Sequence, residues 1–187
     1  MTETETTAKT RFGITSFVYK RRRPFHPQRF SQVLQGLGKL SISGLNELDS
    51  VEESVSFSPA PDGSQQQHVS EELRANLLRS KGFVWMGTSS AAAYFMSHAG
   101  QFLELVVLGR WWADIPQADW PVESIEEIQI DFDSSAPEAG DRRQEIVFIG
   151  QFGEDDSGTS QAALETLLDS CLLTDDEWNV YQNTAPQ

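Results

Sequence analysis

The densest group of side chains that could do chemistry lies in seven consecutive residues: Arg21, Arg22, Arg23, Pro24, Phe25, His26 and Pro27. Guanidinium groups form bidentate, charge-assisted hydrogen bonds with carboxylates and phosphates. The imidazole of His26 can ligate a metal ion, or it can hydrogen-bond the first turn of a helix that follows it. The segment therefore predicts either a contact with an acidic or phosphorylated partner, or an exposed strand end whose charges are solvated.

Charge is distributed unevenly along the 187 residues of the chain. The first thirty residues carry seven basic and two acidic side chains, a net charge of +5, whereas the remaining 157 carry seven basic and twenty-six acidic ones, a net charge of −19. A surface dominated by acidic groups repels polyanions. We therefore expect no nucleic-acid partner, and we expect the basic segment to meet an acidic protein surface.

Few other residues have the chemistry of metal ligands. Cys171 is the only cysteine, which excludes an intramolecular disulfide and a four-cysteine zinc site within this chain. It falls on the apolar stripe of an expected helix, so a buried and inert thiol is predicted. His68 and His98 lie in polar surroundings, and no two histidines have the spacing of ligands on a helix. His26 is then the candidate for a weak zinc site, completed by carboxylates or another histidine.

Sequence patterns of known catalytic sites are absent. The chain contains no G-x-S-x-G, H-E-x-x-H or G-x-x-x-x-G-K-[ST] motif, and the last of these is the loop that holds nucleotide phosphates and magnesium. Carboxylates are frequent between residues 114 and 140, but a solvated loop lacks the fixed geometry that acid–base catalysis requires. The sequence therefore predicts a protein without catalytic activity and without an intrinsic cofactor.

Apolar patterns indicate which elements would position these residues. Residues 13–19 are rich in β-branched and aromatic side chains and predict a strand. Pro27 suits the first turn of a helix, because its missing N–H is no loss there. Two apolar stripes at helical spacing predict one helix through Phe30, Val33, Leu34 and Leu37, and another through Leu164, Leu167, Leu168 and Cys171.

The remaining elements complete an α+β pattern. Further strands are expected at residues 83–86, 101–108 and 144–149, and a short helix at 71–78. Thr174 and Glu177 have the spacing of a capping box, which predicts the start of a last helix. This order predicts a small, mainly antiparallel sheet of about four strands with helices packed on one side.

A single domain is expected for a chain of this length. We expect it to span residues 12–178, with a disordered leader at 1–11, a tail at 179–187 and disordered insertions at about 41–70 and 114–140. Both insertions are rich in Ser, Pro and acidic residues. The polar start at Met1 is unlike a secretory signal, and no run of about eighteen apolar residues could span a membrane. These features predict a cytoplasmic protein.

Six segments, taken together and in this order, closely resemble the CobW C-terminal domain: Phe12-Gly-Ile-Thr-Ser-Phe-Val-Tyr19, Arg22-Arg-Pro-Phe-His-Pro27, Leu78-Arg-Ser-Lys-Gly-Phe83, Gly109-Arg-Trp-Trp112, Asp141-Arg-Arg-Gln-Glu-Ile-Val-Phe-Ile-Gly150 and Cys171-Leu-Leu-Thr-Asp-Asp176. In that family the domain follows a GTPase domain, in proteins regarded as metal chaperones that include zinc-transferring ones. The family's Cys-x-Cys-Cys metal motif belongs to the GTPase domain and has no counterpart here. The resemblance therefore implies the role of the C-terminal module, without nucleotide hydrolysis or high-affinity metal transfer.

The resemblance implies partner-binding roles for the matching positions Arg21, Arg22, Arg23, Phe25, His26, Lys81, Trp111, Trp112 and Arg142. Trp111 and Trp112 are adjacent, so a continuing strand would place one in the core and expose the other to a partner. Our first hypothesis is a docking module that binds a CobW-like GTPase domain in trans, or a client metalloprotein. The alternatives are a domain that weakly binds or delivers zinc, and the detached C-terminal part of a longer GTPase.

Overall fold

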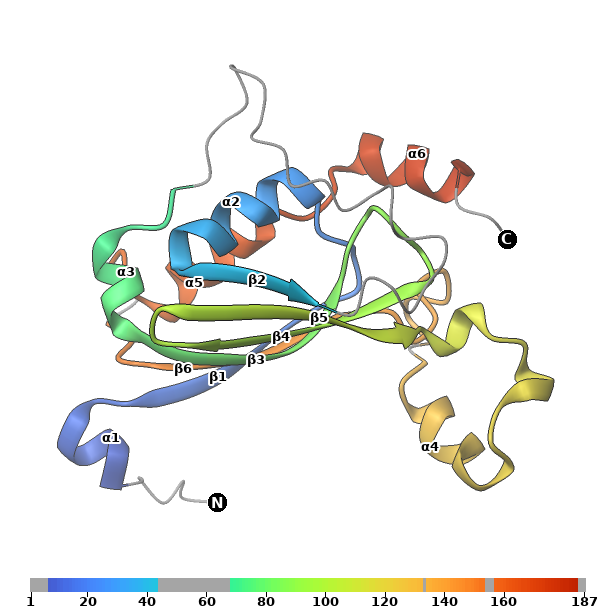
Figure 1. Ribbon diagram of the computed structural model, residues 1–187, viewed down its shortest axis with the longest axis horizontal. Coiled ribbons are helices and arrows are strands. Elements are labelled where there is room, and N and C mark those ends of the chain that lie inside the picture. Colours follow the sequence, from blue (N-terminus) through green and yellow to red (C-terminus); the bar gives the residue numbers. More distant parts are fainter. Residues whose placement is uncertain (1–6, 44–67, 133, 154–156, 185–187) are drawn as a thin grey trace.

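The computed structural model describes residues 7–43, 68–132, 134–153 and 157–184 (Figure 1). None of the helices in these ranges is long and apolar enough to cross a membrane. Three short 3-10 helices lie between β5 and α4. The other elements are, in chain order, α1 (Thr7–Phe12), β1 (Thr15–Arg21), α2 (Pro27–Leu37), β2 (Lys39–Ser43), α3 (Glu71–Asn76), β3 (Leu77–Trp85), β4 (Ala92–Ala99), β5 (Phe102–Arg110), α4 (Ile125–Ile130), β6 (Gln144–Gly150), α5 (Gln161–Asp169) and α6 (Asp175–Thr184).

The strands form one sheet in the order β1-β6-β3-β4-β5-β2. All neighbours are antiparallel except the edge strand β2, which runs parallel to β5. The predicted α+β fold with a mainly antiparallel sheet is confirmed, but the sheet has six strands rather than about four.

The two additional strands, β2 and β4, have weak local signals. β4 contains three alanines and a serine, which have low strand propensity. It is held by ladders to β3 on one side and β5 on the other. β2 is five residues long and begins directly after Gly38. Both strands therefore owe their conformation to pairing with segments that are distant in the sequence.

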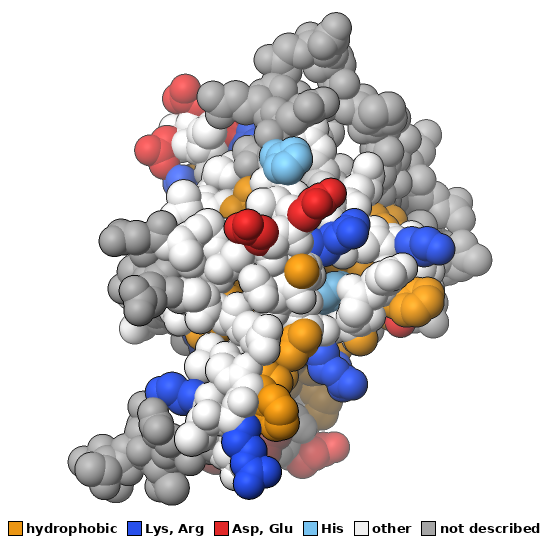
Figure 2. All heavy atoms as spheres, turned by 90° about the vertical axis from the view of Figure 1, so that its left-hand side faces the viewer, with side chains coloured by type: hydrophobic (Ala, Val, Ile, Leu, Met, Phe, Trp, Pro, Cys, Tyr) orange, Lys and Arg blue, Asp and Glu red, His pale blue; other side chains and the backbone are white. Residues whose placement is uncertain are grey.

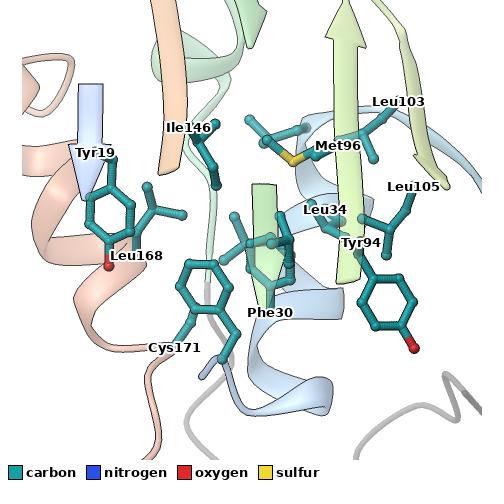
Figure 3. Packing of buried hydrophobic residues seen from close by; sticks show 14 of the residues in the cluster. Tyr19, Phe30, Leu34, Tyr94, Met96, Leu103, Leu105, Ile146, Leu168 and Cys171 are labelled. Carbon is teal, nitrogen blue, oxygen red and sulfur yellow. The ribbon is translucent and has the colours of Figure 1, made fainter. Parts of the chain in front are cut away.

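The main hydrophobic core lies between the sheet and the helices α2 and α5, which cover the same face (Figure 1). Figure 3 shows side chains from both helices converging with those of β1, β4, β5 and β6. The rings of Phe25 and Phe30 stack there with centroids 4.1 Å apart. Both predicted helical stripes are confirmed, because the buried or partly buried residues are Phe30, Val33, Leu34, Leu37, Leu164, Leu167, Leu168 and Cys171.

A second, smaller cluster lies on the other face, at the end of the sheet where β5 and β3 finish. Its buried members are Trp85, Ala93, Trp111 and Ala139. Trp178 and Tyr181 of α6 pack against it, and the Nε1–H of Trp85 donates a hydrogen bond to the Tyr181 hydroxyl. This cluster anchors the last helix to the sheet.

Parts of the expected leader, tail and first insertion belong to the folded domain. α1 covers the end of the leader, and α6 continues to Thr184 within the expected tail. Residues 41–43 complete β2, and Val69 is buried in the main core. The expectation of disorder is wrong for the described parts of the leader and the first insertion, whereas residues 1–6, 44–67 and 185–187 lie outside the described residues.

The second expected insertion, residues 114–140, also contains regular structure. Pro116 and Pro121 precede 3-10 helices instead of interrupting one, which fits the tolerance of proline at helix starts. Ile128 of α4 is buried, and the ring of Trp120 contacts those of Trp112 and Phe132. Apolar anchors spaced among the acidic residues thus hold this segment in place, which the composition of the segment conceals.

Candidate functional site

The arginine segment, residues 21–29, is bound to acidic side chains of α5 and α6. The guanidinium of Arg21 donates to both carboxylate oxygens of Asp169, at 2.7 and 2.8 Å, and the Tyr19 hydroxyl donates to the same carboxylate at 2.8 Å. Arg23 donates to Asp175 at 2.8 Å. The segment is therefore neither a solvated strand end nor an unpaired basic surface, because these guanidinium groups already have carboxylate partners within the chain.

Arg22 binds main-chain carbonyl oxygens. Its guanidinium donates to the carbonyl oxygens of Asp131, Gly140 and Arg142, at 2.8, 3.2 and 3.1 Å. These three acceptors lie at both ends of the segment that follows α4. Arg22 therefore fixes the path of this segment against β1. The sequence predicted a partner contact for Arg22 and did not predict this structural role.

His26 caps the helix that follows it. Its Nδ1 accepts a hydrogen bond from the backbone N–H of Arg29 at 3.4 Å, while Nε2 lies 3.9 Å from an oxygen of Glu177. Burial lowers the pKa of this imidazole, and the nearby Arg29 lowers it further. The structural alternative for His26, a bond to the first helical turn, is confirmed.

Arg29 and Glu177 join α2 to the start of α6. The two guanidinium NH groups of Arg29 donate to the two Glu177 oxygens at 2.9 and 2.6 Å. Glu177 also accepts from the Thr174 N–H, and the Thr174 hydroxyl accepts from the Glu177 N–H. The predicted capping box is confirmed, and the ion pair adds a tertiary contact to it.

Replacing Glu177 with Gln is expected to destabilise the domain by about 1 kcal/mol at pH 7, because the exposed part of the ion pair is screened by solvent. Hydrogen bonding to Arg29 lowers the pKa of Glu177 from 4.5 to about 2. The stabilisation is therefore complete above pH 4.5 and is lost as the pH falls toward 2. Urea unfolding of both proteins at pH 7 and pH 3 measures this, and a difference that does not shrink at pH 3 contradicts it.

The Cys171 thiol is fully buried, as predicted, and burial raises its pKa to about 12. A thiol that stays protonated is a poor metal ligand. Within the described residues, no three His, Cys, Asp or Glu side chains gather in a group that could hold a metal ion. His26 thus has no ligand cluster around it in this part of the chain.

Gln144 organises the arginine segment and was absent from the predicted site. Its Oε1 accepts from the Trp85 N–H at 3.0 Å, and its Nε2 donates to the carbonyl oxygens of Trp85 and Arg23 at 2.7 and 2.9 Å. The sequence does carry a signal for it. Gln144 shares its strand parity with Ile146 and Phe148, so it is a polar residue in a row of core positions.

Trp111 belongs to the second cluster, and Arg142 lines a cleft together with Trp85 and Tyr181 of that cluster. Trp111 is buried, whereas Trp112 is half-buried against Trp120, because a 3-10 helix begins at Trp112 and the strand does not continue. The expected division into one core ring and one freely exposed ring is therefore only half correct. Arg142 donates to the Ser90 carbonyl oxygen at 2.6 Å, and its role here is to link two loops.

Lys81 lies elsewhere, on the sheet face opposite α2 and α5, which we call the open face. Lys81 sits 5.4 Å above the ring of Phe95 on that face. In the described part of the chain, no helix covers the middle of the open face (Figure 1). Six of its side chains, which we call the Phe102 patch, are Val18, Lys39, Arg79, Lys81, Phe102 and Val147.

The sequence profile of one family matches residues 51–172, and its description is "Cobalamin synthesis protein cobW C-terminal domain". The chain belongs to this family. The matched range contains three of the six sequence segments in full, those at 78–83, 109–112 and 141–150, and the elements from α3 to α5, whereas β1, α2 and the arginine segment lie before it.

Relatives of this CobW C-terminal domain are much longer proteins. The chain is 31% identical over 166 residues to "Zinc-regulated GTPase metalloprotein activator 1" of Dictyostelium discoideum. The aligned region covers 89% of this chain but only 26% of that protein. Among solved structures it is similar to the Zn(II)-bound YjiA GTPase from E. coli. The two chains are 13% identical and superpose with a TM-score of 0.45, and the matched region covers 92% of this chain and 34% of the YjiA chain. A Zn(II)-bound triple mutant of the YjiA GTPase gives a TM-score of 0.44.

The positions that the family resemblance singled out do not form one surface. Arg21, Arg23 and His26 face the last two helices, and Phe25 is fully buried in the main core. The remaining positions, Arg22, Trp111, Trp112 and Arg142, hold the segment between β5 and β6. Lys81 alone among them belongs to the Phe102 patch, so the domain's exposed positions must be sought from the fold.

Proposed function

We propose that the chain is a noncatalytic docking module of a CobW-like metal-chaperone system, which binds a GTPase domain of the same family in the cytoplasm. The observation that carries this proposal is the open face of the sheet. A sheet normally buries both faces or presents a polar face to water. Here one face carries the exposed apolar side chains of Phe102, Val18 and Val147, and no helix of the described residues covers the middle of that face.

The length of the relative supports the same reading. The Dictyostelium protein is named a GTPase, and this chain corresponds to 26% of its length. The phosphate-binding motif G-x-x-x-x-G-K-[ST] does not occur in the chain, so a GTPase domain has to come from another chain or from a longer parent protein. In either case the module would act by contact with that domain.

A metal bound by the module itself finds less support. The described residues hold no group of potential ligands, and His26 uses Nδ1 as a helix cap. We therefore propose that zinc is cargo of the GTPase partner, and that the module contributes the protein contact. A client metalloprotein is the second partner class, because a module at the end of a chaperone can also meet the protein that receives the metal.

Affinity isolation of the tagged chain from its own cells tests the proposal. We expect a protein with a phosphate-binding loop and a Cys-x-Cys-Cys motif to be recovered at low and moderate salt, and identified by mass spectrometry. Recovery of metalloproteins without any GTPase of the family would favour the client role. Recovery of no specific protein at either salt concentration would contradict a docking function.

A further inference from the structure

We propose that the Phe102 patch is the surface through which the chain binds the GTPase domain, and that the partner presents carboxylates around an apolar contact. The inference rests on the proposed function and assigns it to six side chains. The chemistry of the partner follows from two properties of these side chains: the apolar ones are exposed, and the basic ones form no ion pair with the described residues.

The sheet register places the members of the patch next to one another. Lys39 lies opposite Phe102, and Val147 lies between Val18 and Lys81. Arg79 and Phe102 pair with the same residue of β4, Ala99, from opposite sides. Neighbouring strands are about 4.8 Å apart, so the patch extends over the sheet from β1 to β2, with the small side chain of Ala99 on β4 between Arg79 and Phe102.

The apolar members are too exposed to serve the fold. Phe102 is 73% exposed, Val18 46% and Val147 38%. Their neighbours along each strand, among them Tyr19, Leu103 and Phe148, are buried in the main core, so the strand alternation directs all three side chains to the open face. Exposed apolar residues gathered on one face are typical of interaction surfaces, and aromatic residues contribute most to binding there.

The basic members have no carboxylate partner among the described residues. Lys39 and Arg79 are exposed and form no ion pair there, and Lys81 contacts only the ring of Phe95. The chain has 28 acidic and 14 basic residues, whereas the face around Phe102 carries three cations without an ion pair in the described residues and one exposed carboxylate, Glu104, two residues after Phe102. Charge complementarity therefore favours a partner that brings carboxylates to this face.

The patch adjoins a cleft that could receive a projecting side chain of the partner. The cleft has a volume of about 560 Å³ and lies between the end of α2, α3 and the turn from β4 to β5, with Lys39, Arg74 and Leu78 in its lining. Figure 2 shows this end of the molecule, where hydrophobic side chains lie between Lys and Arg side chains.

The arginine segment is a weaker candidate for the same contact, although it holds more positive charge. A second cleft, of about 530 Å³, lies beside it and includes Arg21, Arg143 and Glu145. Arg21 is paired with Asp169, and Arg143 with Asp131 and Glu145. A partner would have to break these ion pairs before it could bind there, whereas the Phe102 patch requires no such exchange.

The test is a titration of the full chain with the separately produced GTPase domain of a CobW-family protein from the same organism, followed by calorimetry at low and moderate salt. One variant neutralises the patch with Lys39→Gln, Arg79→Gln and Lys81→Gln. A matched control removes the same charge outside the patch with Lys9→Gln, Arg11→Gln and Arg110→Gln.

A second pair of variants tests the apolar contact by comparing Phe102→Ser with Ile130→Ser, because Ile130 is 81% exposed on α4. Circular dichroism and thermal unfolding establish that each variant is folded.

We expect both patch variants to weaken binding about tenfold or more, and both controls to bind like the wild type. Neutralising the patch should also flatten the dependence of affinity on salt. Unchanged binding by both patch variants would overturn this inference and leave the proposed function standing. Failure of the wild type to bind the GTPase domain would overturn both. Sedimentation that reveals a dimer, dissociated by the patch variants, would assign the face to a second copy instead.

Discussion

Replacing Gly82 with Ala is expected to destabilise the domain by about 3 kcal/mol or more, the largest effect of any single methyl addition in the sheet. Gly82 lies in β3, where the neighbouring strand β6 approaches its Cα closely. A Cβ there would overlap the carbonyl oxygen of Glu145 and lie 2.6 Å from the Cα of Ile146. Both atoms belong to the backbone, so β3 and β6 would have to separate, and the core face and the open face would be disturbed together.

Urea unfolding, followed by tryptophan fluorescence and circular dichroism, measures the effect of Gly82→Ala. Gly158→Ala is the matched control, because a Cβ at Gly158 would meet no atom within 4 Å. We expect the control to change the free energy of unfolding by less than about 0.5 kcal/mol. Equal stability of the two variants would show that β3 and β6 are not packed as closely as described.

Replacing Gln144 with Leu is expected to cost about 2–4 kcal/mol, because buried main-chain groups would lose their partners. Gln144 is fully buried and is similar in size to leucine, so the loss concerns hydrogen bonds rather than volume. The Trp85 N–H and the Arg23 carbonyl oxygen would be left without the amide that now bonds them. The arginine segment would keep its other backbone hydrogen bonds, such as that from the Phe25 N–H to the Trp85 carbonyl oxygen, but it would lose the amide that joins Arg23 to Trp85.

The same unfolding measurement applies to Gln144→Leu, with Gln151→Leu as its control. Gln151 is exposed and donates one hydrogen bond, to the Phe12 carbonyl oxygen at 2.8 Å. We expect the control to cost less than about 1 kcal/mol. A loss at Gln144 no larger than at Gln151 would remove the buried amide from the account of how the arginine segment is positioned.

Elements that carry their own signals could be predicted from the sequence. Pro27 and the stripe from Phe30 to Leu37 gave α2 its observed start and end, and Thr174 with Glu177 marked the start of α6. These signals are local, because capping and helical periodicity involve residues within one or two turns. The identity of the buried side chains on α2 and α5 followed from the same periodicity.

Elements that depend on distant partners could not be predicted in this way. β2 is a strand because β5 lies beside it, and its own five residues carry a weak preference. The segment around α4 is held by Arg22, which is 109 residues away from its acceptor Asp131, and by the ring contacts of Trp120 within the segment. Composition identified this segment as acidic and proline-rich, but composition does not report such contacts.

In the candidate site too, the residue types could be read from the sequence, whereas the contacts between distant residues could not. The sequence revealed the arginines and Lys81, but it did not reveal that Asp169 lies beside Arg21, 148 residues away. It also gave no reason to single out Phe102, which looks like any apolar residue of a strand until its neighbour Leu103 is seen to be buried. Whether a cation is paired within the chain decides its availability to a partner, and pairing is a property of the fold.

Hydroxyl-radical footprinting of the chain, alone and with the GTPase domain, measures whether the open face becomes buried on binding. Side chains that become buried in the complex react more slowly, so each exposed apolar residue reports on its own surroundings. We expect oxidation of Phe102 to slow in the complex, while Ile130 and Val180, which are 81% and 62% exposed, react as before. Slower oxidation of Ile130 or Val180 with no change at Phe102 would contradict docking through the open face.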